Sequence, residues 1–389
     1  MKYRLEDICS FRKEKVAVSS LTLKNYISTE NMLPNKAGIT KATSLPKCNT
    51  TQRFECGDVL VSNIRPYFKK IWKAKFNGGC SNDVLVFSSK EGFDTEFLYY
   101  VLSDDSFFEY SMATSKGTKM PRGDKKSIMN YEVPGFDMNI QIKIASILKS
   151  IDDKIELNNK INNNLEQQYI SMVDHLLSKL TQYKIYSLSE VADCQNGRAF
   201  YKEGYDPNGA FVIDLGNVNT FGNFVRTATD KYISLDRYKE PKLEKYRVYK
   251  NDIVMVMTDR KSTMELLGKV GKIYKDGYYL LNQRMYRIRA KKGINTNYLY
   301  ACLNSTETSN FLKRKALGSV QKYVNTGEIN SIEIKVPSSE KMEEIASILD
   351  PIFSQMELNI LENESLTELR DILLPKLMSG ELDVSDIDL

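Results

Sequence analysis

The chain has 389 residues, 42% of them hydrophobic and 27% charged, a composition typical of a folded protein with two or three domains. No stretch approaches the roughly 20 consecutive apolar residues of a membrane helix. The first residues lack the apolar region of a signal peptide. Six scattered cysteines form no CxxC pair, so we expect reduced thiols in a cytoplasmic protein, without a metal site or a disulfide framework.

The net charge of +5 is unevenly distributed along the chain. Residues 1–138 contain 21 Lys and Arg against 16 Asp and Glu, and residues 183–338 contain 26 against 16. Residues 339–389, in contrast, contain 3 against 13. Basic charge confined to two segments favours a polyanion as the ligand, because each cation set against a phosphate releases condensed counterions. The alternative is an uneven surface charge without a partner.

The first basic segment, residues 1–138, has the pattern of an α+β domain. Short apolar runs among polar loops predict strands at 58–62 and 83–87. The pattern at 95–102 predicts a short helix. Strands and helices in one segment indicate a mixed domain rather than an all-β one.

A long amphipathic helix is predicted over residues 139–182. Its apolar residues alternate at spacings of four and three, which is the pattern of a coiled-coil seam. Asn158 and Asn162 interrupt this seam near its middle. A helix of this length needs a partner for its apolar stripe. The seam residues are Ile144, Leu148, Ile151, Ile155, Leu165, Tyr169, Met172 and Leu176.

The second basic segment, residues 183–338, repeats the α+β pattern. It has predicted strands at 211–213, 252–257 and 332–337 and a predicted helix at 296–303. The helix is a copy of the one in the first segment, displaced by 201 residues.

A second long helix is predicted over residues 339–378 and is followed by an acidic tail at 379–389. Asn359 and Asn363 interrupt its seam. Pro351 predicts that the helix bends or restarts, because proline removes a backbone donor and clashes with the preceding turn. The acidic helix and tail either face a basic partner or stay in solvent. The seam residues are Ile345, Leu349, Ile352, Met356, Leu366, Leu373 and Leu377.

These segments form an internal repeat. Residues 144–148 and 156–158 recur as 345–349 and 357–359, both at a displacement of 201. In the globular segments the displacement drifts, as expected when insertions and deletions accumulate in loops, where they cost little. We infer a duplication of one globular unit with its helix.

The duplicated asparagines predict how the two helices pair. In an antiparallel pair, Asn158 and Asn162 come to lie near Asn363 and Asn359. A buried asparagine pair lowers stability but fixes register and orientation. The alternative is an Asn-rich composition that placed these residues there by chance.

Three stretches resemble the specificity subunits of type I restriction–modification enzymes, the HsdS family. They are residues 141–158, their copy at 345–359, which departs from the pattern at 351–354, and the ending at 374–382. The resemblance covers the architecture of the whole chain, and its motifs occur twice in the expected order. It implies an α+β fold with two pseudo-two-fold-related globular target recognition domains, joined by two long antiparallel helices that form a coiled coil.

The resemblance also implies a function and partners. Each target recognition domain would read one half of a bipartite, asymmetric site on double-stranded DNA. The helices would set the gap and dock DNA adenine methyltransferase subunits, which we expect to number two, and in a restriction system also restriction or translocase subunits. The subunit itself would be non-catalytic, without a cofactor or metal. Recognition domains differ so much between relatives that the resemblance identifies the class of ligand and not the sequence read.

Polar, basic loops beside strands are the candidates for DNA contact, because base edges and phosphates are bound by such side chains. The first domain has two such loops, at 62–70 and 115–126, and the second has equivalents at 257–263 and 318–323. The alternative for any single residue is a solvated surface charge. The predicted DNA-binding residues are Asn63, Arg65, Tyr67, Lys69, Lys70, Lys116, Thr118, Lys119, Arg122, Lys125, Arg198, Tyr201, Lys202, Arg260, Lys261, Ser262, Ser319, Gln321, Lys322 and Tyr323, with Arg226, Gln283 and Arg284 as weaker candidates.

The sequence offers no catalytic site. The single histidine, His175, lies beside the seam residue Leu176, and we interpret it as a packing residue. The chain lacks a GxxxxGK[ST] phosphate loop and the Asn/Asp-Pro-Pro-aromatic motif that adenine methyltransferases use. Residues 333–335 have the ExK shape of a nuclease strand, but strand alternation explains them adequately. We therefore expect the chemistry on other chains.

Two alternatives remain open. One is the specificity component of a modification-only system, which the sequence does not separate from a restriction system. The other is a coiled-coil scaffold whose globular domains bind proteins, against which the basic charge of those domains argues.

Overall fold

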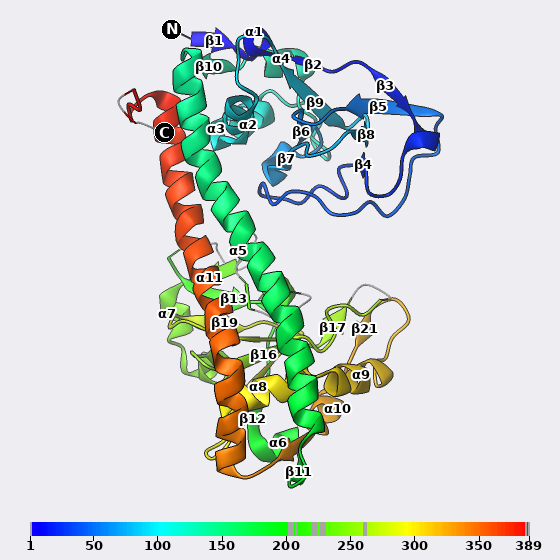
Figure 1. Ribbon diagram of the computed structural model, residues 1–389, viewed down its shortest axis with the longest axis vertical. Coiled ribbons are helices and arrows are strands. Elements are labelled where there is room, and N and C mark those ends of the chain that lie inside the picture. The colour runs from blue at the N-terminus through cyan, green and yellow to red at the C-terminus, as the bar shows by residue number, and fades with distance from the viewer. Residues whose placement is uncertain are drawn as a thin grey trace. The chain divides into compact units, whose positions relative to one another are not determined.

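The computed structural model describes the chain except residues 1, 201–205, 207, 220–223, 226–230, 260–262, 386 and 388–389. The chain forms two compact units, Met1–Glu156 with Glu364–Leu389, and Leu157–Asn363. Each unit contains one globular body and one stretch of each of two long helices, α5 (Met138–Ser178) and α11 (Ser339–Ser379) (Figure 1). Within the described part of the chain, no helix combines the length and the apolarity that spanning a membrane requires.

The first body consists of two four-stranded sheets and a set of short helices. One sheet has the order β2 (Cys9–Phe11), β9 (Val84–Ser89), β6 (Val59–Ser62), β7 (Ile71–Lys73), and the other has the order β3 (Lys15–Ala17), β5 (Thr50–Phe54), β8 (Gly78–Cys80), β4 (Tyr26–Ile27). The remaining elements are the paired strands β1 (Lys2–Arg4) and β10 (Glu132–Pro134) and the helices α1 (Leu5–Ile8), η1 (Val18–Ser20), η2 (Pro66–Phe68), α2 (Thr95–Ser103), α3 (Asp105–Ala113) and α4 (Lys125–Met129).

The second body repeats this architecture. Its sheets have the orders β12 (Ala192–Asn196), β20 (Met285–Ala290), β16 (Ile253–Val256), β18 (Val270–Lys272), and β14 (Lys231–Ile233), β13 (Ala210–Ile213), β19 (Tyr279–Leu281), β15 (Arg247–Val248). The remaining elements are the paired strands β11 (Lys184–Ser187) and β22 (Glu333–Val336), the pair β17 (Thr258–Asp259) and β21 (Lys322–Tyr323), and the helices α6 (Leu188–Val191), η3 (Leu215–Asn217), α7 (Leu235–Tyr238), η4 (Pro241–Tyr246), α8 (Thr296–Asn304), α9 (Thr306–Arg314) and α10 (Thr326–Asn330).

The two bodies share a core and differ at their edges. The first sheet of each body has the same strand order, and β8 and β19 each have one parallel and one antiparallel neighbour. The fourth strand of the second sheet differs, because β3 extends the antiparallel side in the first body and β14 extends the parallel side in the second. The predicted α+β repeat is therefore confirmed, with divergence confined to edge strands and loops.

The predicted strands and helices form where the apolar runs lie. β6 is buried along its whole length and pairs with β9 and β7. A strand covered on both faces needs an unbroken apolar run rather than alternation. Helices α2 and α8 begin at copied capping residues, since the Asp94 side chain accepts from the Phe97 amide and the Asn295 side chain accepts from the Tyr298 amide.

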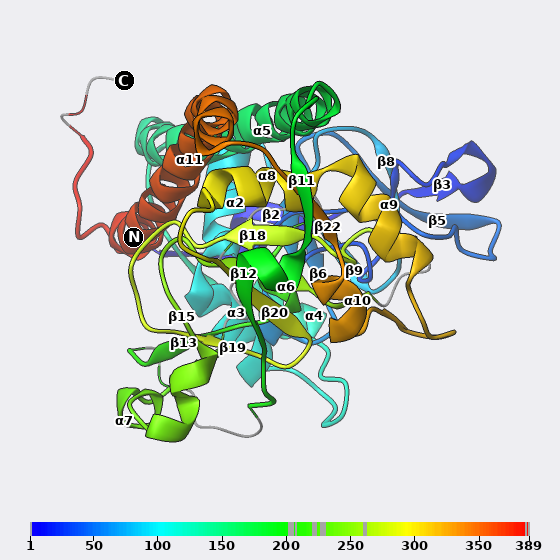
Figure 2. The ribbon, with the colours of Figure 1, turned by 90° about the horizontal axis from the view of Figure 1, so that it is seen from below.

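A short helix joins each body to the long helices. In the first unit, α2 buries Leu98 and Leu102 in one cluster with Ile144 and Leu148 of α5. In the second unit, α8 lies between the long helices and the sheet that contains β18 and β20 (Figure 2). The Tyr300 ring of α8 is 5.0 Å from the Phe353 ring of α11.

The long helices pair in antiparallel orientation in both units. In the second unit, the Tyr169 ring of α5 is 6.3 Å from the Phe353 ring of α11. In the first unit, the Arg370 guanidinium donates to the Asp152 carboxylate at 3.0 Å. Residue numbers on α5 decrease along the contact, from 169 to 152, while those of their partners on α11 increase, from 353 to 370. The predicted antiparallel pairing is therefore confirmed.

The four seam asparagines lie at the contact between these helices in the second unit. The Asn359 Nδ2 group donates to Asn162 Oδ1 at 2.8 Å, and Asn162 Nδ2 donates to the Met356 carbonyl at 3.2 Å. Asn158 Nδ2 donates to Asn363 Oδ1 at 2.9 Å. Their role in fixing the register stays a prediction.

Two other expectations about the helices were wrong. Helix α11 does not restart at Pro351, since it is one helix over Ser339–Ser379, with Phe353 and Met356 buried beyond the proline and the Asn297 side-chain amide donating to the Asp350 carboxylate at 2.7 Å just before it. His175 is exposed and does not pack. The acidic tail is exposed over most of its described residues, as one of the two alternatives predicted, but Val384 is buried in the core of the first unit.

We expect Asn162→Ala to destabilise the protein by about 1–3 kcal/mol, because it leaves the Asn359 amide buried without its acceptor. The exposed Asn163 of the same helix provides the matched control, and Asn163→Ala should change the free energy of unfolding by less than about 0.5 kcal/mol. Urea unfolding followed by circular dichroism measures both. Equal effects of the two substitutions would contradict the structural role of Asn162.

Candidate nucleic-acid interface

The two loops predicted to contact nucleic acid in the first domain meet in the structure. The Arg65 amide donates to the Pro121 carbonyl at 2.8 Å, and the Gly123 amide donates to the Asn63 carbonyl at 3.2 Å. Ile64 and Arg122 form an antiparallel bridge between these contacts. The end of β6 is therefore fastened to the loop that precedes α4.

That second loop is a hairpin, residues 116–122. Lys116 and Arg122 close it through two backbone hydrogen bonds of 2.9 Å, and Gly117 adopts a φ of 92°. Thr118 and Lys119 are exposed at its tip. The tip is thus a displayed polar and basic segment on a fixed base.

Several of the predicted basic side chains already hold partners. Arg122 lies 3.1 Å from the Asp83 carboxylate. Lys116 forms a 2.6 Å ion pair with Asp124 and holds the pKa of that carboxyl well below its usual value. The exposed Lys125 has its ammonium 5.9 Å from the centre of the Phe11 ring. A DNA phosphate would compete with the Asp83 and Asp124 carboxylates for Arg122 and Lys116. It would not compete with the Phe11 ring for Lys125.

The loop after β6 has a strained backbone. Arg65 and Lys69 have φ values of 51° and 49°, a region that residues with a side chain seldom adopt. Between them the Tyr67 ring is 49% exposed. The Lys70 ammonium donates to the Thr29 carbonyl at 2.5 Å, and burial lowers the pKa of Lys70. Tyr67 is thus displayed, whereas Lys70 is half-buried and its ammonium is held by a backbone carbonyl.

An ion cluster fixes the other end of this loop. The ammonium groups of Lys36 and Lys69 lie 2.8 and 2.7 Å from the Asp105 carboxylate. Burial alone would raise the pKa of Asp105, but these two ammonium groups lower it below its usual value. Lys69, which was predicted to bind DNA, therefore also forms an ion pair within the protein.

The second body has the same construction. Thr258 pairs with Tyr323 and Asp259 with Lys322, and the Val324 amide donates to the Met257 carbonyl at 3.0 Å. Leu317 and Tyr323 close a hairpin at positions that correspond to Lys116 and Arg122 in the first body. Both bodies therefore fasten a strand end to a hairpin through the same backbone contacts, although the side chains differ.

The remaining predicted residues of the second body fall into three groups. Arg198 stacks its guanidinium on the Phe200 and Tyr246 rings, at 5.6 and 5.9 Å from their centres. Ser319 and Tyr323 are exposed, and Gln321 and Lys322 are half-buried. Outside the described residues lie Tyr201, Lys202, Arg226, Arg260, Lys261 and Ser262.

A polar cavity of about 610 Å³ lies beside the second hairpin. Sequence reasoning missed Asn196 and Asn325 as parts of this site, because they lie on segments far apart in the chain that only the sheet brings together. The other lining residues are Gly197, Met257, Thr258, Gln283, Arg284, Gln321, Tyr323, Val324 and Thr326.

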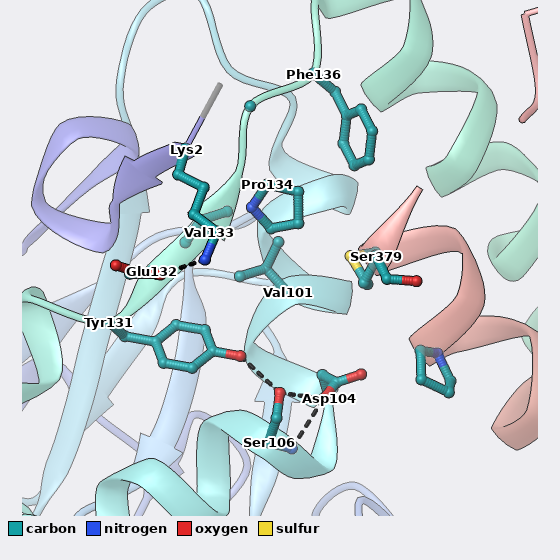
Figure 3. Close-up of a pocket in the computed structure, with 13 residues that line it drawn as sticks. Lys2, Val101, Asp104, Ser106, Tyr131, Glu132, Val133, Pro134, Phe136 and Ser379 are labelled. Carbon is teal, nitrogen blue, oxygen red and sulfur yellow. Dashed lines mark hydrogen bonds and ion pairs between the residues drawn. The ribbon is translucent and has the colours of Figure 1, made fainter. Parts of the chain in front are cut away.

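Another cavity, of about 730 Å³, lies in the first unit and shares no residue with the predicted loops (Figure 3). Its walls include Val101, Val133 and Phe136. Its polar groups are already paired, as the Tyr131 and Ser106 hydroxyls are 2.7 Å apart and the Asp104 side chain accepts from the Ser106 amide at 2.8 Å. It is therefore not a candidate for reading bases.

The corresponding place in the second unit is smaller, about 240 Å³. There the Asp174 carboxylate accepts from the Thr306 amide at 2.9 Å, and Lys335 forms a 3.0 Å ion pair with Glu307. The corresponding positions in the first unit are Pro375, Asp105, Pro134 and Ser106, which cannot make these contacts. Among the residues that the structure describes, no group of three or more His, Cys, Asp and Glu side chains could hold a metal ion.

A duplicated α+β body, each copy carried on an antiparallel pair of long helices, is the architecture of a specificity subunit. The chain belongs to the family described as the type I restriction modification DNA specificity domain, which matches residues 1–167 and again residues 181–368. The predicted resemblance is thereby confirmed.

Individual relatives agree with this assignment. The type I restriction enzyme MjaVIII specificity subunit of Methanocaldococcus jannaschii is 25% identical over 321 residues, 76% of this chain and 72% of that protein. The HindI specificity subunit of Haemophilus influenzae is 24% identical over 457 residues, 98% of this chain and 99% of that protein. The crystal structure of a type I restriction–modification S subunit from M. genitalium has the same fold, with a TM-score of 0.54 at 17% identity, and covers 97% of this chain and 96% of that one.

The hairpin glycines predict a graded set of effects. A Cβ on Gly318 would lie 2.1 Å from the Gln321 carbonyl oxygen, whereas a Cβ on Gly117 would lie 3.4 Å from its nearest neighbour and one on Gly327 would meet nothing within 4 Å. We expect Gly318→Ala to lower the free energy of unfolding most, by about 1–3 kcal/mol, and Gly117→Ala to lower it less, through φ strain alone. Gly327→Ala, inside helix α10, should raise it by about 0.5–1 kcal/mol, because Ala favours a helix over Gly. Differential scanning calorimetry gives the order, and a cost for Gly117→Ala that equals or exceeds that for Gly318→Ala would contradict it.

Proposed function

We propose that this specificity subunit reads a bipartite, asymmetric site on double-stranded DNA, with one half-site for each globular body. The observation that carries the proposal is the duplicated junction of strand end and hairpin, built on the same backbone contacts but with different side chains. One scaffold with two side-chain sets suits two different half-sites.

Within each junction the side chains divide by chemistry. Exposed cations such as Lys119 and Lys125 suit phosphate contacts, which give affinity without sequence preference. Amides and hydroxyls such as Asn63 and Gln321 suit base edges, which carry a distinct pattern of donors and acceptors in the major groove. The other predicted DNA-binding residues that the structure describes belong to the same proposal, under which residues 1–138 and 183–338 are the two target recognition domains.

The helices would set the gap between half-sites and dock the modification subunits. Leu157 and Leu358 occupy equivalent positions of the repeat, and their side chains are 51% and 59% exposed. Two equivalent exposed leucines support two equivalent docking positions, because large apolar side chains are displayed where a partner covers them. The methyl transfer, and cleavage where a restriction subunit is present, would then occur on the partner chains.

A randomised duplex library tests the proposal, with the full chain alone and with a co-expressed adenine methyltransferase. Selection of two short fixed half-sites at a constant separation is the expected result. Salt-dependent binding without sequence preference would overturn it, and no binding to DNA at all would favour the scaffold alternative. Cleavage assays with a co-expressed restriction subunit then distinguish a restriction system from a modification-only one.

Removal of the two hairpin cations should weaken DNA binding. We expect Lys119→Ala with Arg122→Ala to raise Kd for the cognate duplex and to reduce the slope of log K against log salt by about two, because each of the two cations would neutralise one phosphate. The control is Lys2→Ala with Lys149→Ala, which removes the same charge from ion pairs outside both loops. Unchanged affinity in a salt titration would remove this hairpin from the proposed interface.

Charging the exposed leucines should weaken docking of the methyltransferase. We expect Leu157→Lys with Leu358→Lys to raise the Kd for the methyltransferase at least about tenfold, because burying one leucine contributes about 1.5–3 kcal/mol. The melting temperature should not change, since both side chains are exposed.

The control adds the same charge at polar exposed positions of α5, with Asn163→Lys and Gln167→Lys. Sedimentation of the purified complex gives the stoichiometry and the affinity. Full binding of two methyltransferase subunits by the leucine variant would show that docking uses another surface.

A further inference from the structure

We infer that Gln321, together with Thr258, specifies one base pair of the half-site read by the second body, and that this base pair carries adenine on the strand that Gln321 contacts. The inference rests on the proposed function, because it assigns a residue-level role within it.

The first observation is that two buried polar atoms have no partner. Among the described residues, neither Gln321 Nε2 nor Thr258 Oγ1 has a hydrogen-bond partner, although both atoms are covered. A covered donor or acceptor without a partner costs free energy, so such atoms usually indicate a strained place or a ligand site. These two lie on adjacent segments, the hairpin end and the strand β17.

The second observation is that both residues line the same cavity of about 610 Å³. Asn196, Gln283 and Asn325 line it as well, and each has a carboxamide. Its walls are therefore rich in groups that both donate and accept hydrogen bonds. Arg284 adds one cation to the lining, but the carboxamides outnumber it, and paired donors and acceptors are what the edge of a base offers in the major groove.

The third observation is that the backbone under Gln321 is fixed. Leu317 and Tyr323 exchange backbone hydrogen bonds of 2.9 and 3.0 Å, and Tyr323 also pairs with Thr258. Gly318 has a φ of 89°, and its Cα hydrogens face the Gln321 carbonyl so closely that no larger residue fits. The backbone that carries the Gln321 side chain therefore has a defined position, as discrimination between bases requires.

The chemistry of the carboxamide selects the base. In the major groove adenine presents an acceptor at N7 and a donor at N6, and one carboxamide can donate to the first and accept from the second in a single plane. Guanine presents two acceptors there and would be matched by an arginine, and cytosine presents a donor and would be matched by a carboxylate. The Thr258 hydroxyl can bond to either kind of edge, so it adds affinity at the same base pair.

The first body has different groups at the same junction. There the partnerless covered atoms are Asn63 Oδ1 and Arg65 Nε. Both bodies thus place such atoms where the strand end meets the hairpin, although the residues are unrelated in type. This recurrence supports recognition as the reason for them, and the difference accounts for an asymmetric site.

The experiment selects binding sites from a randomised duplex library with the full chain and its methyltransferase, for the wild type and three variants. Gln321→Ala should lose the preference for adenine at one position of one half-site by about tenfold or more. Gln321→Glu, which only accepts, should shift that position toward cytosine. Val320→Ala, which alters a fully displayed neighbour in the same hairpin, should leave the motif unchanged.

The other half-site is an internal control in every selection. If it persists in the Gln321 variants while the assigned position is unaltered, this inference fails and the proposed function stands. If Gln321→Ala and Gln321→Glu degrade both half-sites together, Gln321 has a structural role and the inference also fails. If the wild type selects no bipartite motif, the proposed function itself fails.

Discussion

The antiparallel contact between α5 and α11 is the constraint on which the rest of the structure depends. Each globular body packs against both helices, so a shift of one helix along the other would disturb the packing of each body. Ion pairs add to this packing, since the equivalent residues Glu156 and Glu357 each pair with a lysine of their own body, Lys75 in the first unit and Lys272 in the second, although these two lysines are not equivalent. Burial lowers the pKa of Lys272 and raises that of Glu357, whereas the interaction of each group with the other shifts both pKa values in the opposite direction. Buried pairs of this kind favour one arrangement more than they add stability.

This constraint explains why the two halves of each repeat diverged differently. A deletion in a helix would rotate every later seam residue away from its partner, whereas a deletion in a loop changes only a local connection. The displacement of 201 residues is accordingly constant from the short helix at 95–102 through the long helix to 156–158, and it drifts only in the earlier parts of the bodies, as between 57–60 and 251–254. The contrast between β3 and β14 shows the same tolerance in three dimensions, since an edge strand can be added on either side of a conserved core.

Much of this fold could be predicted from the sequence, because its signals are local. The seam spacing predicted the helices, apolar runs such as 252–257 predicted central strands, and the repeat predicted that the bodies share an architecture. The misses are all non-local. Pro351 was expected to bend or restart the helix, but the helix continues through it, and Phe353 and Met356 beyond it are buried. The polar cavity could not be predicted either, because its walls come from segments more than 100 residues apart, such as those of Asn196 and Asn325.

The separation of scaffold from side chains has a consequence for how such a protein can change its target. At the junction of strand end and hairpin the contacts are made by backbone atoms, as between Arg65 and Pro121 or between Val324 and Met257, so they do not depend on which side chains are present. The Nε2 atom of a side chain such as Gln321 has no hydrogen-bond partner in the described part of the chain, so it adds no stabilising hydrogen bond to the fold. Substitution there alters the hydrogen-bonding pattern offered to a ligand while the fold persists. Specificity can then vary independently of stability, provided that the helix contact stays fixed.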